Sequence, residues 1–260
     1  MRELRIPFPP LRRGNKVAMI TLAVAWIAVA SVGYWADDGL DLFAWLAGSD
    51  AILRGEVWRL LTSFIVHQPV GSGSLWHLFT TLLGLYFLGT SLEERWNTKR
   101  YLLFLVATGV FASACQVLLG AFIPYLHAPM YYGAIGVVDA VAIAWALSFR
   151  DEKVQLFFAM PINPKGLILF ILGINILFGV VLGARHEGLV TPFAGMLAGW
   201  MGADGSPLRR AFLQRRFKSL QAQSEALRGV KAQRGPKLRV VKGGRAGEGE
   251  EGKPKKEMLN

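Results

Sequence analysis

Asp139 is the one acidic residue inside an otherwise apolar stretch, residues 131–149, which is long enough to be a membrane span. A carboxylate at membrane depth is costly and marks a candidate functional site. On a helix Asp139 lies four residues after Ile135, on the same face and one turn further along. Two interpretations stay open: an acid–base group, or a structural carboxylate that holds neighbouring helices together by hydrogen bonds.

The four histidines do not follow a metal-binding pattern. His67, His77, His127 and His186 lie in different segments without a His-x-x-x-His spacing, and we expect no carboxylate to be paired with them. We therefore expect no metal site and no cofactor, and we expect His77 to make a hydrogen bond at a helix start. Cys115 is the only cysteine, so no intrachain disulfide can form. Its apolar surroundings favour a packing role over a reactive thiol.

The composition is that of a membrane protein. Hydrophobic residues make up 53% of the chain and charged residues 18%, and the apolar residues cluster in long blocks. We expect an all-α membrane protein with six transmembrane helices. The first block is read as a retained span, because no cleavage site of a signal peptide follows it. The expected spans are residues 17–36, 75–92, 101–123, 131–149, 166–183 and 189–201.

The basic residues predict the topology and the domains. Of the 29 Lys and Arg residues, all except Arg54, Arg59 and Arg185 fall on one side of a six-span arrangement. The positive-inside rule makes that side, with both termini, cytoplasmic. The expected parts are a basic N-terminal segment, a membrane domain, a basic amphipathic helix and a disordered tail, over residues 1–16, 17–203, 204–230 and 231–260. Anionic lipids explain the basic tail without nucleic acid as a partner.

Five short motifs occur in order between residues 56 and 201. Together they resemble the rhomboid family, with spacings that fit six spans. The motifs are Glu56-Val57-Trp58-Arg59-Leu60-Leu61-Thr62, His77-Leu78-Phe79-Thr80-Thr81, Leu92-Glu93-Glu94-Arg95-Trp96, Gly133-Ala134-Ile135-Gly136, and Pro192-Phe193-Ala194-Gly195 followed by Gly199. The resemblance implies structural roles for Trp58, Arg59, Gly133, Gly136, Gly195 and Gly199.

The resemblance also implies a serine protease site, and this chain departs from it. Rhomboids are intramembrane serine proteases with the serine on the fourth span and the histidine on the sixth. A serine needs a base within hydrogen-bond reach and donors for the oxyanion. Here Ile135 stands at the serine position and Pro192 at the histidine position. Thr81 replaces the asparagine that accompanies His77 in the family.

The resulting hypothesis is a catalytically inactive pseudoprotease that binds or escorts transmembrane client proteins. Family geometry places Thr81, Asn175 and Thr191 near Asp139, and we expect clients to be bound by His77, Thr81, Asp139 and Thr191. The alternatives are an active intramembrane serine endopeptidase with an unorthodox site, and a small-solute transporter, although no repeated hydropathy supports the latter. We expect a multi-pass protein of the bacterial inner membrane.

Overall fold

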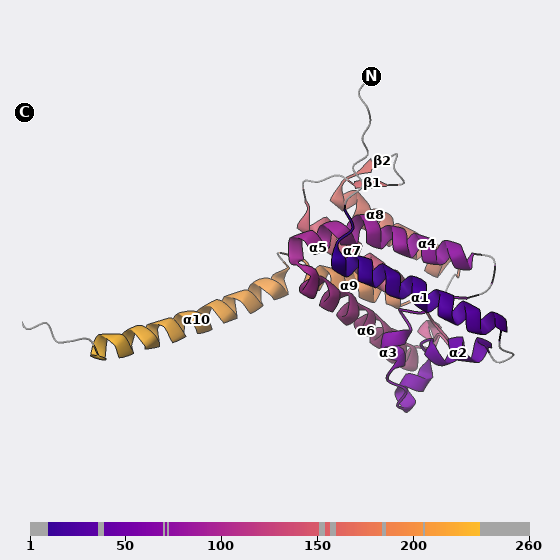
Figure 1. Ribbon diagram of the computed structural model, residues 1–260, viewed down its shortest axis with the longest axis horizontal. Coiled ribbons are helices and arrows are strands. Elements are labelled where there is room, and N and C mark those ends of the chain that lie inside the picture. Colours follow the sequence, from indigo (N-terminus) through magenta and orange to yellow (C-terminus); the bar gives the residue numbers. More distant parts are fainter. Residues whose placement is uncertain are drawn as a thin grey trace, which may run out of the picture. The chain divides into compact units, whose positions relative to one another are not determined.

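The computed structural model describes residues 10–35, 39–69, 71, 73–150, 154–156, 160–183, 186–204 and 206–234 (Figure 1). Residues up to Leu213 belong to one compact unit, and the chain from Gln214 onward forms a second unit. The predicted basic segment 1–16 lies mostly outside the described residues, and so does the predicted disordered tail 231–260.

The described chain is almost entirely helical. In chain order its elements are α1 (Arg13–Trp35), α2 (Gly39–Leu46), the 3-10 helix η1 (Asp50–Arg54), α3 (Arg59–Thr62), α4 (Ser74–Gly84), the π-helical η2 (Leu85–Gly89), α5 (Thr90–Trp96), α6 (Thr98–Phe122), the 3-10 helix η3 (Pro124–Leu126), α7 (Ile135–Ser148), β1 (Val154–Leu156), β2 (Met160–Ile162), α8 (Pro164–Asn175), the π-helical η4 (Ile176–Val181), α9 (Thr191–Gly202) and α10 (Pro207–Arg234).

Four of the six predicted spans have the length and hydropathy of a membrane crossing. Among the described residues these are α1, the continuous helix Ser74–Trp96, α6, and Pro164–Val181. The helices α7 and α9 contain only 14 and 12 residues. A straight helix of that length rises about 18–21 Å, which is less than the roughly 30 Å of bilayer hydrocarbon.

The prediction of a helix over residues 131–149 is wrong at its start. Tyr131 exchanges two backbone hydrogen bonds with Gly48, of 2.8 and 2.9 Å, and therefore lies in a β-bridge. Gly133 has a φ of 101°, which lies outside the helical region and favours glycine. The chain turns into α7 only at Ile135. Apolar composition alone does not distinguish such an extended entry from a helical turn.

A short hairpin and a long basic helix complete the described chain. Strands β1 and β2 pair antiparallel, with Val154 opposite Ile162, inside the segment predicted as a polar loop. The all-α expectation therefore holds apart from this hairpin. The helix α10 starts at Pro207 and continues to Arg234, beyond the predicted end at residue 230. Several of its large apolar side chains are exposed, among them Phe217 and Leu220.

The helix α7 lies at the centre of the first unit. It contacts α4, α5, α6, α8 and α9, and in Figure 1 its label lies among those of α4, α5, α8 and α9. Its closest partner is α9, because both helices present small residues at their contact. A Cβ atom built on Gly195 would lie 1.9 Å from the carbonyl oxygen of Gly136, and one on Gly199 would lie 2.5 Å from that of Ala140. Small residues of this kind allow two backbones to approach closely in a membrane.

Arg59 holds the first loop together. Its Nη1 donates hydrogen bonds to the carbonyl oxygens of Ala44 and Ala47, at 2.5 and 2.6 Å. Its Nε donates to the Glu56 carboxylate at 2.5 Å. The two bonds from Nη1 satisfy carbonyl oxygens at the C-terminal end of α2 and directly after it, which have no partner within that helix. The Trp58 ring packs against Trp45, with 5.1 Å between the ring centroids.

Glu93 on α5 caps the N-terminus of α1. Its Oε1 accepts hydrogen bonds from the Gly14 backbone N–H at 2.8 Å and from the Thr98 hydroxyl at 2.6 Å. Its Oε2 accepts from the Asn15 backbone N–H at 2.7 Å. The first backbone N–H groups of a helix lack partners within the helix, and the helix dipole favours an anion there. One buried carboxylate thus connects α1, α5 and α6.

Replacing Glu93 by glutamine is expected to lower the free energy of unfolding by about 2–3 kcal/mol, because the amide presents an N–H₂ group to donors that need an acceptor. The measurement is thermal or denaturant unfolding in detergent. Glu94→Gln is the matched control. Glu94 is exposed and pairs only with the exposed Arg12 among the contacts described for it, so its loss is expected to cost less than about 1 kcal/mol. Equal effects of the two variants would contradict the capping role.

Candidate functional site

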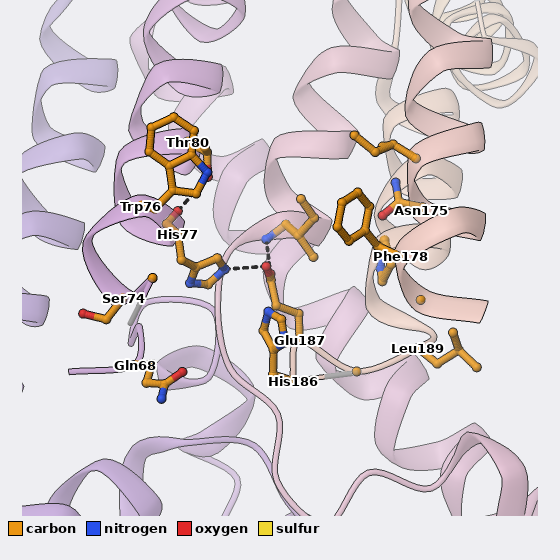
Figure 2. A pocket seen from close by; sticks show the side chains of 16 residues that line it. Gln68, Ser74, Trp76, His77, Thr80, Asn175, Phe178, His186, Glu187 and Leu189 are labelled. Carbon is orange, nitrogen blue, oxygen red and sulfur yellow. Dashed lines mark hydrogen bonds and ion pairs between the residues drawn. The ribbon is translucent and has the colours of Figure 1, made fainter. Parts of the chain in front are cut away.

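A cavity of about 420 Å³ opens between α4, the start of α7, the α8–η4 helix and the start of α9 (Figure 2). The turn between η4 and α9 forms part of its wall. The lining residues used below are Trp76, His77, Ile135, Asn175, Phe178, His186, Glu187 and Pro192. The cavity is therefore assembled from α4, the start of α7 and the continuous segment from α8 to α9, which are far apart in the sequence.

Ile135 and Pro192 line this same cavity. Ile135 is the first residue of α7, and Pro192 is the second residue of α9. Because α7 packs closely on α9, the two residues lie in the lining of the same cavity. Neither side chain has a hydroxyl, an imidazole or any other group that transfers a proton. These two residues therefore cannot supply a nucleophile and its base.

Glu187 links the N-terminus of α7 to α4. Its Oε1 forms a hydrogen bond with Nε2 of His77, and its Oε2 accepts a hydrogen bond of 2.8 Å from the Ile135 backbone N–H. Figure 2 shows both bonds as dashed lines, with the His186 ring beside the carboxylate. A helix N-terminus favours an adjacent anion. A carboxylate thus faces the cavity at the first residue of α7.

Gly133 makes this arrangement possible. A Cβ atom built on it would lie 2.7 Å from Cε1 of His77 and 2.8 Å from Oε2 of Glu187. Its N–H donates a hydrogen bond of 2.9 Å to the carbonyl of Ser63. Any larger residue would therefore push the histidine and the carboxylate away from the backbone.

His67 packs with its ring against the ring of His77. Its side chain is fully buried, and the two ring centroids lie 4.9 Å apart. Burial, and then the neighbouring His77, lower the pKa of His67 to about 4. The ring is therefore neutral at pH 7. Its Nδ1 lies 3.2 Å from the Ile65 carbonyl and donates the proton, because a carbonyl can only accept.

Asp139 is a structural partner of Asn175 and does not line the cavity. Nδ2 of Asn175 donates a hydrogen bond of 2.7 Å to Asp139 and another of 2.9 Å to the Ile171 carbonyl. Both side chains are buried. The expected proximity of Asp139 and Asn175 is confirmed. The contact fits the structural interpretation of this carboxylate, in which it holds α7 and α8 together.

Thr81 and Thr191 also lie outside the cavity lining. The Thr81 hydroxyl donates to the His77 carbonyl at 3.1 Å. The Thr191 hydroxyl donates to the carbonyl of Glu187, and lies 3.3 Å from that of Gly188. Each hydroxyl thus bonds the backbone of its own or the adjoining segment, as threonine often does. Of the four residues expected to bind a client, only His77 faces the cavity.

His186 and Glu187 are the site residues that the sequence reasoning missed. The ligand atoms of His77, His186 and Glu187 all lie within 4.8 Å of one another. The expectation that no carboxylate accompanies the histidines is therefore wrong. The available signal was an adjacent His–Glu pair in the turn between two apolar segments. His127 lies in a different place and pairs with Asp50 at 2.8 Å.

Comparisons with known proteins agree with this architecture. The Rhomboid domain model matches residues 54–204, more than half of the chain. Rhomboid protease GlpG of Salmonella choleraesuis is 25% identical over 203 residues, which are 75% of this chain and 67% of the relative. GlpG of Salmonella typhi gives the same values. GlpG of Salmonella paratyphi A is 26% identical over 179 residues, which are 66% of this chain and 57% of the relative. The chain therefore belongs to the rhomboid family and is a multi-pass integral membrane protein.

Proposed function

We propose that this chain is a catalytically inactive rhomboid that binds transmembrane client proteins and escorts or retains them. One observation carries the proposal: Ile135 and Pro192, which the resemblance places at the family's serine and histidine positions, line one cavity of about 420 Å³. At these two positions the cavity lacks the groups that peptide hydrolysis needs. A family member that keeps the cavity and lacks the chemistry is suited to binding a chain without cutting it.

The residues that line the cavity support the proposal that the client is a transmembrane protein. Trp76 on α4 and Phe178 on η4 line the cavity and remain 67% and 50% exposed. Polar residues, including His77 and Asn175, also line the cavity. A client helix with an unsatisfied polar group gains most from partners at such a place, because the surrounding lipid offers none.

We further propose six membrane crossings with both termini in the cytoplasm of a bacterium. The positive-inside distribution of Lys and Arg supports this orientation. In this arrangement the short helices α7 and α9 cross inside the bundle, where neighbouring helices shield their ends. Their lengths favour a locally thinned bilayer, which would ease the lateral movement of clients. The exposed apolar and basic residues of α10 support binding to anionic lipids.

The client site can be tested by photocrosslinking in liposomes. A photoreactive residue at position 178 is expected to crosslink a single-span test protein with glycine and proline in its span several-fold more strongly than a matched all-leucine span. The matched control is the same residue at position 103, because Leu103 is also exposed but lies on α6 outside the cavity lining. The test protein is expected to remain full length. Equal crosslinking at both positions would contradict the proposed client site.

An active intramembrane endopeptidase with an unorthodox site is the second candidate. The pairing of His77 with Glu187 inside the cavity favours it, because a histidine held by a carboxylate is a suitable general base. This candidate requires cleavage of the test protein by the unmodified chain and its loss in His77→Ala. Intact test protein after prolonged incubation would exclude it and support the inactive form.

A further inference from the structure

His77, His186 and Glu187 bring three possible metal ligands together from two distant segments. His77 lies in the first turn of α4, and the other two residues lie in the turn before α9. One ligand atom of each lies within 4.8 Å of those of the other two. Figure 2 shows the His77 ring directed at the Glu187 carboxylate, with the His186 ring next to it. His77 lies 110 residues from Glu187 in the chain, so sequence spacing does not indicate that it joins the adjacent His186–Glu187 pair.

The distances require only a small adjustment to hold an ion. In a tetrahedral zinc site with bonds of about 2.1 Å, the ligand atoms lie about 3.4 Å apart. His77 and Glu187 already lie closer than that, within hydrogen-bond distance. His77 and Glu187 must therefore separate slightly, and because all three ligand atoms lie within 4.8 Å of one another, His186 needs to approach by at most about 1.5 Å. Its side chain is exposed, so a rotation of the ring meets little resistance.

The surroundings hold two of the three ligands in place. The second oxygen of Glu187 accepts a hydrogen bond from the Ile135 backbone N–H, which fixes the carboxylate. The buried ring of His67 packs against His77 and restricts its orientation. Supporting contacts of this kind accompany metal ligands and orient them. The side chains of His77 and Glu187 are only 18% and 13% exposed, which strengthens their attraction for a cation.

We propose that His77, His186 and Glu187 form a binding site for a divalent transition metal ion, with Zn²⁺ as the best-fitting ion. Two imidazoles and one carboxylate are a common ligand set for zinc. The fourth position faces the cavity, where water can occupy it. The bound ion connects the turn before α9 to the start of α4. This proposal does not depend on client binding, and it adds a ligand to the cavity wall.

The test is zinc binding by the full-length chain, purified in detergent with an affinity tag that lacks histidine and dialysed against a chelator. Calorimetry and elemental analysis are expected to give one Zn²⁺ per chain. His186→Ala and Glu187→Gln are each expected to weaken binding at least about tenfold. Co²⁺ in place of Zn²⁺ is expected to give the absorption spectrum of a tetrahedral nitrogen–oxygen site, which reports the geometry independently of affinity.

His127→Ala is the matched control, because His127 also pairs with a carboxylate, Asp50, and both are partly exposed. This variant is expected to bind zinc as the unmodified chain does. Thermal unfolding without metal verifies that each variant is folded. The proposal is overturned by the absence of stoichiometric zinc binding. It is equally overturned if folded His186→Ala and Glu187→Gln bind zinc normally, or if His127→Ala loses as much affinity as they do.

Discussion

Replacing Gly195 by alanine is expected to lower the free energy of unfolding by at least about 3 kcal/mol. The new Cβ atom would lie 1.9 Å from the carbonyl oxygen of Gly136 and 2.6 Å from its carbonyl carbon. A backbone carbonyl inside a helix cannot rotate away as a flexible side chain can. The helices α7 and α9 must therefore separate, and many packed contacts are lost along their length. The same separation would move Pro192 away from Ile135.

The measurement is thermal unfolding in detergent, with Gly173→Ala as the matched control. Gly173 lies within α8, and a Cβ atom built there meets nothing within 4 Å. Alanine has the higher helix propensity, so this variant is expected to be unchanged or stabilised by up to about 1 kcal/mol. A Gly195→Ala protein as stable as the Gly173→Ala protein would show that the two helices do not meet as closely as described.

The double variant Ile135→Ser, Pro192→His is expected to react with serine-directed fluorophosphonates at least about tenfold more than the unmodified chain. Both positions line one cavity, so the two new side chains face the same space. The single variants are expected to stay at background, because a nucleophile and its base act as a unit. Proline at the second position of α9 gives no hydrogen bond that histidine would disrupt, so the exchange is compatible with the helix.

Labelling and cleavage of a single-span substrate in liposomes measure the outcome. Adding Glu187→Gln is expected to increase the labelling rate further. In the unmodified chain the Glu187 carboxylate accepts the hydrogen bond of the N–H at position 135, and its negative charge disfavours a developing oxyanion. Labelling of the unmodified chain would contradict an inactive site. The double variant could unfold at the same temperature as the unmodified chain and still show neither labelling nor cleavage, with and without Glu187→Gln. That result would show that an active site requires more changes than these two residues.

Local sequence patterns were sufficient for much of the architecture. Long apolar blocks predicted the four helices of membrane-spanning length, because hydrophobicity over about 20 residues reports burial in lipid directly. The secondary-structure predictions were wrong where tertiary contacts, and not local composition, determine the backbone conformation. Residues 131–134 are apolar but extended, because Tyr131 bridges to Gly48 and Gly133 adopts a positive φ. The hairpin β1–β2 was missed because its strands are only three residues long.

The candidate site was predicted only in part. The proximity of Asp139 and Asn175 was expected from family geometry, and their hydrogen bond gives the buried carboxylate a donor. The sequence did not show that the hydroxyls of Thr81 and Thr191 bond backbone carbonyls, because propensity does not reveal which way a side chain turns. Their role in client binding stays a prediction.

The sequence by itself determined that this chain is a helical membrane protein of rhomboid type, and the resemblance places isoleucine and proline where the family has a serine and a histidine. Residue identity alone excludes proton transfer by these two side chains, since no fold can give a hydrocarbon side chain a proton to transfer. Only the tertiary structure decided what surrounds those positions. His77 and Glu187 are 110 residues apart, and their meeting depends on how α4 and α9 pack around α7. Packing of this kind is long-range and depends on shape, so it leaves no local pattern in the sequence.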